Sequence, residues 1–233
     1  MRDAVKLAEI GRISMPKPLD MYTLYYAPGT ASMAAHMALN EIGAPYRLER
    51  VDFEHKAQRS EAYLRLNPLG QVPTLVIDGQ PYTESAALLM MLADRHPEAR
   101  LAPLPGTPKR NEWYQWMVFL SNALGASFRT WFYPQDLGAA DHPPAVRAAL
   151  QAHIEGLWTR LDNHLVSRGP YLLGDQLSAA DLQLIMYMRW SRNMLRSALD
   201  WPALRLLATL LRRRESWQRL CDVENLNEWR GPD

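Results

Sequence analysis

A turn between a predicted strand and a predicted helix carries hydroxyl side chains but no thiol. The stretch LYYAPGTASMAAHMALNEIG spans residues 24–43 and places Tyr26, Thr30 and Ser32 around a Pro-Gly turn. The first N–H groups of a helix lack backbone partners, and the helix dipole is positive at that end. The chemistry expected here is therefore hydrogen bonding to an anion, and not catalysis by a cysteine of the protein.

A second motif, GQVPTLVIDG at residues 70–79, places Pro73 directly before a predicted strand. Proline cannot donate a hydrogen bond to a sheet, so it belongs at the first residue of the strand. If the Val72–Pro73 bond is cis, the N–H and C=O of Val72 turn outward and can pair with an extended peptide. The alternative is an ordinary trans proline that begins a strand.

A third motif, YTESAALLMML, places Glu84 and Ser85 at the start of an apolar helix. The free N–H groups there can bind a ligand carboxylate, and Glu84 can accept a hydrogen bond from a ligand ammonium group. The alternative is that Thr83, Glu84 and Ser85 only cap the helix. Together with the second motif, this one suits a small peptide that has a free α-amino acid end.

The elements around these motifs alternate from residue 21 to about residue 95. The pattern predicts strands at 21–26, 46–53, 73–78 and 81–83, and helices at 32–43, 59–67 and 84–96. This βαβα order followed by ββα is typical of a thioredoxin-like α/β domain, which we place at residues 21–98. Residues 1–20 are expected to be a leader.

Beyond a Pro- and Gly-rich linker at residues 99–108, the pattern becomes helical. We expect helices at about 109–130, 144–167, 178–195 and 201–219, which form an all-α bundle over residues 109–225, followed by a tail at 226–233. Ser178 and Asp181 form an S-x-x-D capping box before one helix. The run LRRRES at residues 211–216 is interpreted as a solvated helix face.

Composition limits the classes of partner. The formal net charge is +1, so the chain has no overall field for nucleic acid or an anionic membrane, and no apolar run is long enough to span one. Cys221 is the only cysteine, which excludes an internal disulfide and suggests a cytoplasmic protein. We interpret Cys221 as an incidental buried thiol, and no metal is expected.

Three motifs, NPLGQVPTL, ESAALLMMLAD and LSAADLQL, occur in the order and at the spacing of one known family. Through them the chain resembles the glutathione S-transferases from residue 21 to about residue 220. The opening LYYAPGTASMAAHMAL is most similar to the bacterial beta class. The resemblance implies glutathione as co-substrate and a homodimer.

The resemblance also assigns binding residues. It implies that Gln71 and the backbone of Val72, next to Pro73, hold the glutathione backbone, and that Glu84 and Ser85 hold its γ-glutamyl end. Lys56 matches a basic residue near the glycyl carboxylate only loosely. Arg59 competes with it for that role, and solvated surface charge is the alternative for both.

The chain departs from the beta class at the catalytic turn. Ala31 stands where that class has its cysteine, and Gly125 and Ala126 replace a His-Lys pair near the sulfur. The glutathione thiol must then be ionised by hydrogen bonds. A free thiol has a pKa of about 8.5, and lowering it by about two units, roughly 2.7 kcal/mol, suffices. The candidate donors are Ser32, Tyr26 and Thr30; Ser32 is favoured narrowly, and Thr30 is alternatively the N-cap.

The function implied is conjugation or reduction of small, apolar electrophiles with glutathione. An aromatic run is expected either to line the acceptor pocket or to belong to the core or a subunit interface: Trp116, Phe128, Trp131, Phe132 and Tyr133. The alternative functions are a glutathione-dependent peroxidase or disulfide reductase, and a non-catalytic protein-interaction module of the same architecture.

Overall fold

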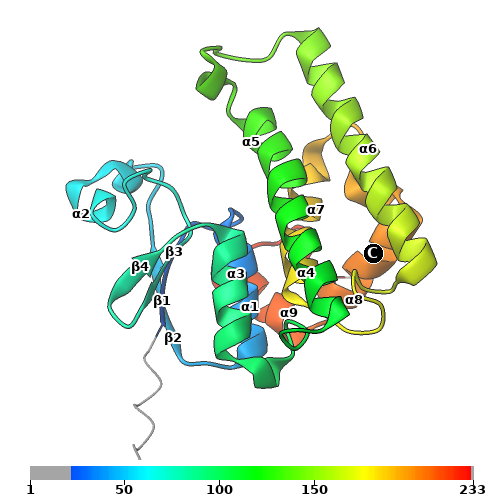
Figure 1. Cartoon of the computed structure of the whole chain (residues 1–233). Coiled ribbons are helices and arrows are strands. Elements are labelled where there is room, and N and C mark those ends of the chain that lie inside the picture. The colour runs from blue at the N-terminus through cyan, green and yellow to red at the C-terminus, as the bar shows by residue number, and fades with distance from the viewer. Residues whose placement is uncertain (1–21, 232–233) are drawn as a thin grey trace, which may run out of the picture.

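The computed structural model describes residues 22–231, and the expected leader at residues 1–20 lies outside them. A thioredoxin-like domain comes first and an all-helical domain second, as expected. Figure 1 shows the small sheet on one side, α1 and α3 beside it, and the long helices of the second domain beyond them. Among the described residues, no helix is long and apolar enough to cross a membrane.

The sheet has four strands in the order β2-β1-β3-β4. They are β1 (Tyr22–Tyr26), β2 (Tyr46–Arg50), β3 (Thr74–Ile77) and β4 (Gln80–Tyr82). β1 runs parallel to β2 and antiparallel to β3, with Leu24 opposite both Leu48 and Leu75. β3 and β4 form the antiparallel hairpin predicted from the Asp78-Gly79 turn.

Successive side chains of β1 point to opposite faces of the sheet. Tyr22, Leu24 and Tyr26 are buried in the main core, on the face that α1 and α3 cover. Tyr25 packs on the other face, against the small cluster formed by Ala27, Val51, Tyr63 and Val72. The strand therefore ends between two packed layers, and the turn that follows it is held on both sides.

Three helices belong to the first domain: α1 (Ser32–Ile42), α2 (Glu61–Leu64) and α3 (Ser85–Arg95). α1 ends at Gly43, whose φ of +70° is the left-handed conformation common after a helix. Short 3-10 turns lie at Ala57–Arg59 and Pro97–Ala99. α2 is shorter than the predicted helix at residues 59–67.

The second domain consists of helices joined by short turns. They are α4 (Pro108–Phe119), a π-helical turn (Leu120–Gly125), α5 (Ala126–Phe132), α6 (Pro144–Arg168), α7 (Ala179–Trp190), α8 (Pro202–Arg212) and α9 (Glu215–Glu224). Further 3-10 turns lie at Pro134–Leu137, Ser191–Asn193 and Ala198–Asp200. The capping box of Ser178 and Asp181 is confirmed at the start of α7.

The single helix predicted at residues 201–219 is wrong, because the chain breaks at Arg214. Arg214 has an extended backbone, and its guanidinium donates to both carboxylate oxygens of Glu41 in α1, at 2.5 and 2.7 Å. The LRRRES run is therefore not a uniformly solvated face. Arg212 is also buried, and its Nε donates to the carbonyl of Trp229.

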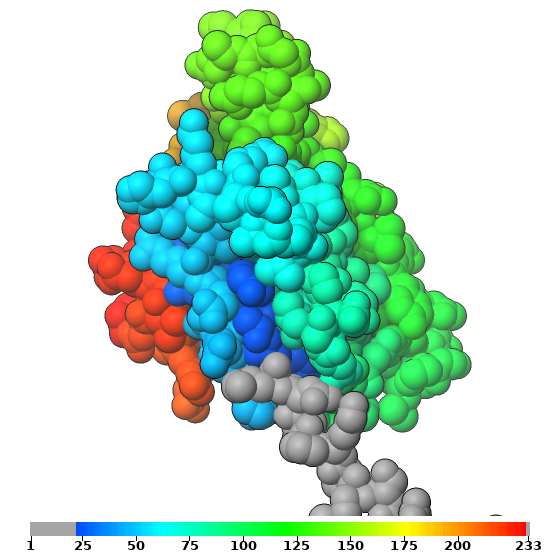
Figure 2. Space-filling model, turned by 90° about the vertical axis from the view of Figure 1, so that its left-hand side faces the viewer, coloured from blue at the N-terminus to red at the C-terminus, as the bar shows by residue number. Residues whose placement is uncertain are grey.

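One cluster of buried apolar side chains runs through both domains, so the two share a core. Within the described part of the tail, Leu226 packs into this cluster and Trp229 lies against it. The far ends of α5 and α6, with the turn between them, rise above the thioredoxin-like domain (Figure 2). α7 and α9 pack against α1, and the candidate site lies at the N-terminus of α1.

Candidate active site

The turn between β1 and α1 leaves the N-terminus of α1 without a side-chain cap. Gly29 has a φ of +71°, which glycine adopts without strain. Ala31 is the residue before the helix, and no side chain caps it. Thr30 is therefore not the N-cap, which was one of its two alternatives. The first turn of α1 keeps the N–H donors and the dipole that stabilise an anion.

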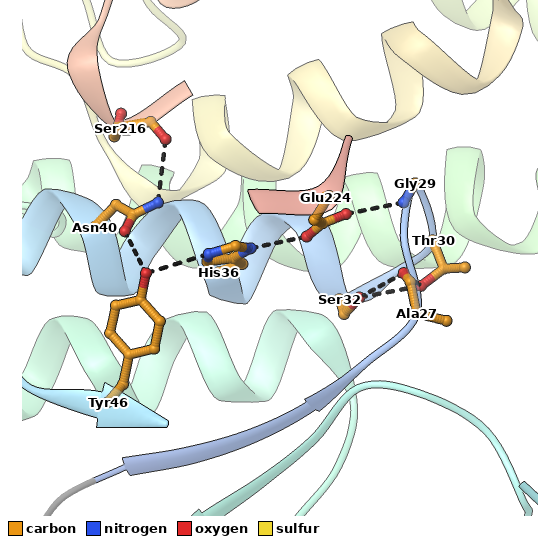
Figure 3. A network of polar contacts seen from close by, with 9 residues as sticks. All are labelled: Ala27, Gly29, Thr30, Ser32, His36, Asn40, Tyr46, Ser216 and Glu224. Carbon is orange, nitrogen blue, oxygen red and sulfur yellow. Dashed lines mark hydrogen bonds and ion pairs between the residues drawn. The ribbon is translucent and has the colours of Figure 1, made fainter. Parts of the chain in front are cut away.

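Two of the predicted hydroxyls meet at this turn (Figure 3). Thr30 Oγ1 donates to the carbonyl of Ala27 at 2.7 Å, and Ser32 Oγ donates to the same carbonyl at 3.1 Å. The two hydroxyl oxygens are themselves 3.1 Å apart. Thr30 and Ser32 thus form one small network in which either hydroxyl can donate to the Ala27 carbonyl.

The three candidate donors differ in exposure. Ser32 is fully buried, and Tyr26 is buried at the end of β1 with its ring 6.2 Å from that of His36. Burial, together with the charge of Glu224, raises the pKa of the Tyr26 hydroxyl. Thr30 is partly exposed. Of the three candidates only Thr30 is not buried, and the narrow preference for Ser32 stays a prediction.

The segment before β3 presents an unpaired piece of backbone. The Val72–Pro73 bond is cis, and Pro73 is buried just before the strand. The carbonyl of Gln71 accepts hydrogen bonds from Tyr63 Oη at 2.6 Å and Asn67 Nδ2 at 2.8 Å. The backbone N–H and C=O of Val72 have no partner among residues 22–231. The backbone of Val72 is thus held in place and is free to form hydrogen bonds with an extended ligand.

The start of α3 lies against the same turn. Ser85 Oγ donates to the carbonyl of Ala31 at 2.9 Å, which joins the N-terminus of α3 to that of α1. Glu84 is exposed and has a φ of 68°, uncommon for a residue with a side chain. No side chain caps α3, so the capping alternative for Thr83, Glu84 and Ser85 is wrong.

The basic candidates lie farther along the first domain. Lys56 is exposed at the start of a 3-10 turn, and within residues 22–231 no hydrogen bond or ion pair holds its side chain. Arg59 is exposed too, but its Nη1 donates to the carbonyl of Leu69 at 3.3 Å, close to Gly70. Arg59 is thus fixed beside the segment that precedes Val72, whereas Lys56 is not.

A buried polar network behind the turn was not predicted. Glu224 in α9 accepts from the N–H of Gly29 at 2.8 Å, and its other oxygen lies 2.8 Å from Nδ1 of His36. Nε2 of His36 is 3.2 Å from Tyr46 Oη, which also donates to Asn40. Figure 3 shows this chain of contacts running along α1 to the turn.

Aromatic side chains of the second domain approach the turn from α7. Trp190 Nε1 donates to the carbonyl of Gly29 at 3.1 Å, and its ring packs edge-on against Phe128, Phe132 and Tyr187. Trp190 was not among the predicted residues. Of the predicted aromatic run, Trp116 and Phe128 belong to the core, while Phe132 and Tyr133 are exposed.

Comparison with known proteins agrees with this arrangement. Residues 30–95 match the model of the glutathione S-transferase N-terminal domain, and residues 144–230 match that of the C-terminal domain. The chain is 34% identical to glutathione S-transferase GST-4.5 of Xanthomonas campestris, over 73% of this chain and 82% of that protein. The chain belongs to the glutathione S-transferase family.

Solved structures of the family superpose over most of the molecule. A sphingomonad glutathione S-transferase in complex with glutathione is 30% identical, with a TM-score of 0.78 over 88% of this chain and 99% of that one. A bacterial beta-class enzyme from Sphingomonas chungbukensis is 28% identical, with a TM-score of 0.77 over 88% and 99%. This glutathione S-transferase is thus similar to the beta class.

The only cysteine of this glutathione S-transferase lies outside the turn. Cys221 is fully buried in α9, and burial raises the pKa of its thiol to about 11. Ala31 occupies the turn itself, and Gly125 lies in the π-helical turn with no side chain. No cluster of three or more His, Cys, Asp or Glu side chains is placed to hold a metal within residues 22–231.

Proposed function

We propose that this glutathione S-transferase binds glutathione along the first domain and uses its thiolate to attack small, apolar electrophiles. The observation that carries the proposal is the hydrogen bond from Ser85 to Ala31. It joins the N-termini of α1 and α3, and Val72, whose backbone is unpaired among residues 22–231, packs with Ala27 of the turn before α1. Glutathione bound in the sphingomonad relative supports the same ligand here.

The peptide backbone of glutathione pairs with Val72. An extended peptide can donate to the free C=O of Val72 and accept from its N–H, as in the addition of a strand to a sheet. Gln71 is exposed beside this edge, and Pro73 anchors it to β3. Arg59 or Lys56 supplies the positive charge for the glycyl carboxylate. Arg59 is the better placed of the two, because Leu69 already holds it.

The γ-glutamyl end of glutathione binds at the start of α3. Its carboxylate accepts hydrogen bonds from the N–H groups of the uncapped first turn, while the Ser85 hydroxyl, which donates to Ala31, holds this turn beside α1. Glu84 is exposed at the same point, and its carboxylate accepts from the ligand ammonium group. The carboxylate and the ammonium group of the ligand are thus both bound at two adjacent residues, Glu84 and Ser85.

The sulfur lies at the start of α1 and is ionised there. Thr30 Oγ1 turns its proton from Ala27 to the sulfur, while Ser32 keeps the Ala27 carbonyl satisfied. The N–H groups and the dipole of α1 add to this stabilisation. The thiol proton passes to solvent. The thiolate then attacks the electrophilic carbon, a C–S bond forms, and the leaving group, a halide ion for an aryl halide, departs to solvent; no cysteine of the enzyme takes part. We assign no role to Tyr26, which is buried at the end of β1.

Calorimetric titration with glutathione tests the binding step. Ser85→Ala removes the hydrogen bond that joins the starts of α3 and α1, and it is expected to weaken glutathione binding about tenfold, the equivalent of roughly 1.4 kcal/mol. Ser167→Ala, an exposed hydroxyl on α6, is the matched control and leaves binding unchanged. Absence of any heat with glutathione would favour a non-catalytic protein.

A substrate panel tests the reaction. We expect conjugation of aryl halides by the wild-type enzyme. Activity with hydroperoxides and none with aryl halides would instead identify a peroxidase or reductase that uses two glutathiones. We also propose that the enzyme is a cytoplasmic homodimer. Light scattering tests the oligomeric state, and a monomer at micromolar concentration would contradict it.

A further inference from the structure

Arg189 in α7 is a buried cation with unused hydrogen-bond donors. Its exposed fraction is 4%, and among the described residues neither Nε nor Nη1 has a hydrogen-bond partner. A buried guanidinium is normally paired, since leaving a charge unpaired in the interior costs several kcal/mol. Such an exception calls for a functional reason.

The guanidinium lies directly against the turn at the start of α1. A Cβ atom built on Gly29 would be 3.1 Å from Nη1 of Arg189 and 3.6 Å from Leu226. A side chain at this position would therefore crowd the arginine. The absence of a side chain at Gly29, together with its left-handed φ, allows the charge to reach the backbone of the turn.

The charged groups around Arg189 are engaged elsewhere. Glu228 is paired with Arg192 at 2.6 Å. Glu224 uses one oxygen for the Gly29 N–H and the other for His36. The Cys221 thiol also lies nearby, and the positive charge of Arg189 lowers its pKa against the larger effect of burial. Each neighbouring carboxylate thus has partners of its own, and Arg189 keeps an excess of positive charge.

We propose that Arg189 is a positioning residue whose buried positive charge, held against Gly29, favours the thiolate form of glutathione at the turn. The inference rests on the proposed function, because it requires a glutathione sulfur at the start of α1. A guanidinium stays protonated at neutral pH, and charges interact more strongly across a poorly solvated interior than through water. The neighbouring Trp190 donates to the Gly29 carbonyl and so fixes the turn. The guanidinium of Arg189 and the bound thiolate are thereby held in place relative to each other.

The test is the pKa of glutathione bound to variants of Arg189, measured from the ultraviolet absorbance of the thiolate. Arg189→Met keeps the length of the side chain and removes the charge, and we expect the thiol pKa to rise by about one unit. Below that pKa, kcat/KM then falls about tenfold, and it recovers at high pH. Arg189→Lys restores most of the effect, because it restores the charge.

Arg168→Met is the matched control, since Arg168 is an exposed arginine of α6 that is paired with a carboxylate, Glu112, and does not face Arg189. It should leave the thiol pKa unchanged. Arg189→Gln is a second neutral variant in case Arg189→Met does not fold. Loss of folded protein in both neutral variants would assign Arg189 a packing role and would overturn the inference.

The remaining outcomes separate this inference from the proposed function. Wild-type protein that binds glutathione and lowers its thiol pKa, with the same pKa in Arg189→Met and Arg189→Gln, would overturn the role of Arg189 alone. Wild-type protein that binds no glutathione would overturn both. An equal rise in Arg189→Lys and Arg189→Met would show that the shape of the guanidinium matters and that its charge does not.

Discussion

The backbone N–H of Gly29 donates a hydrogen bond to Oε2 of Glu224, 2.8 Å away, although 195 residues separate the two in sequence. The last turn of α9 thereby holds the turn at the start of α1. Glu224 is itself buried, and its second oxygen contacts His36. The shape of the candidate active site in the first domain thus depends on a side chain of the second.

Removal of this carboxylate should destabilise the protein and loosen the turn. Glu224→Ala leaves both the Gly29 N–H and His36 without their acceptor, and we expect a loss of about 3 kcal/mol in urea unfolding. Glu224→Gln keeps the shape and one acceptor, so it costs less. Asp222→Ala on the exposed side of α9 is the control. A Glu224→Ala variant as stable as this control would contradict the role of Glu224.

Gly125 and Tyr187 should be energetically coupled. A Cβ at Gly125 would lie 2.8 Å from Tyr187 Oη, and the Tyr187 ring cannot easily retreat because it is stacked on Phe128. Gly125→Ala is therefore expected to cost about 1–3 kcal/mol. Much of this loss should disappear when Tyr187→Phe removes the hydroxyl as well.

The control for this pair is Gly156→Ala in α6, where a new Cβ meets nothing within 4 Å. Because alanine favours a helix, it should stabilise the protein by about 0.5–1 kcal/mol. If the losses of unfolding free energy in Gly125→Ala and Tyr187→Phe simply add up in the double variant, the close contact does not cause the destabilisation by Gly125→Ala. Chemical unfolding measures these losses.

Asp181 should make stability depend on pH. Burial raises the pKa of its carboxyl from 3.8 to about 6, against hydrogen bonds from Leu172 and Ser178. The folded state then holds the proton more tightly than the unfolded state between about pH 4 and 6. This contribution is therefore fully present below pH 4 and is lost as the pH rises through 6.

Comparison with Asp181→Asn, which does not titrate, isolates this effect. Between pH 4 and 7 the wild type should lose on the order of 2–3 kcal/mol of unfolding free energy relative to Asp181→Asn. Asp181→Ala should cost about 1 kcal/mol or more, since the capping box is lost. A difference between wild type and Asp181→Asn that stays constant across this range would refute the shifted pKa.

Cys221 should play no part in the chemistry. Its thiol is fully buried with a pKa of about 11, so almost none is thiolate near pH 7. We expect the folded protein to react slowly with thiol reagents, and Cys221→Ala to retain conjugation activity. Complete loss of activity in a folded Cys221→Ala variant would mean that the protein supplies a sulfur after all.

Local patterns predicted the parts of the site that lie within one segment. The Val72–Pro73 motif and the Glu84-Ser85 helix start follow from turn chemistry and helix ends, both of which act over a few residues. The break at Arg214 could not be found in this way, because it depends on a salt bridge to Glu41 in another helix.

Contacts between distant segments left no signal in the sequence. His36 and Glu224 meet across 188 residues, and a lone histidine on an apolar helix does not indicate its partner. The burial of Ser32 depends on how the first turn of α1 packs, and neighbouring Thr30 and Ser32 look alike as residue types. The unpaired donors of Arg189 could not be predicted from the sequence either, because they depend on how the surrounding core packs.

The pKa of the glutathione thiol in the complex tests the central claim most directly. Titration of the thiolate absorbance should give a value about two units below the ordinary 8.5. The value should rise in Thr30→Val, which keeps the shape of the side chain and removes its hydroxyl, and stay low in Ser167→Ala. A bound thiol that titrates at 8.5 in the wild type would contradict the account.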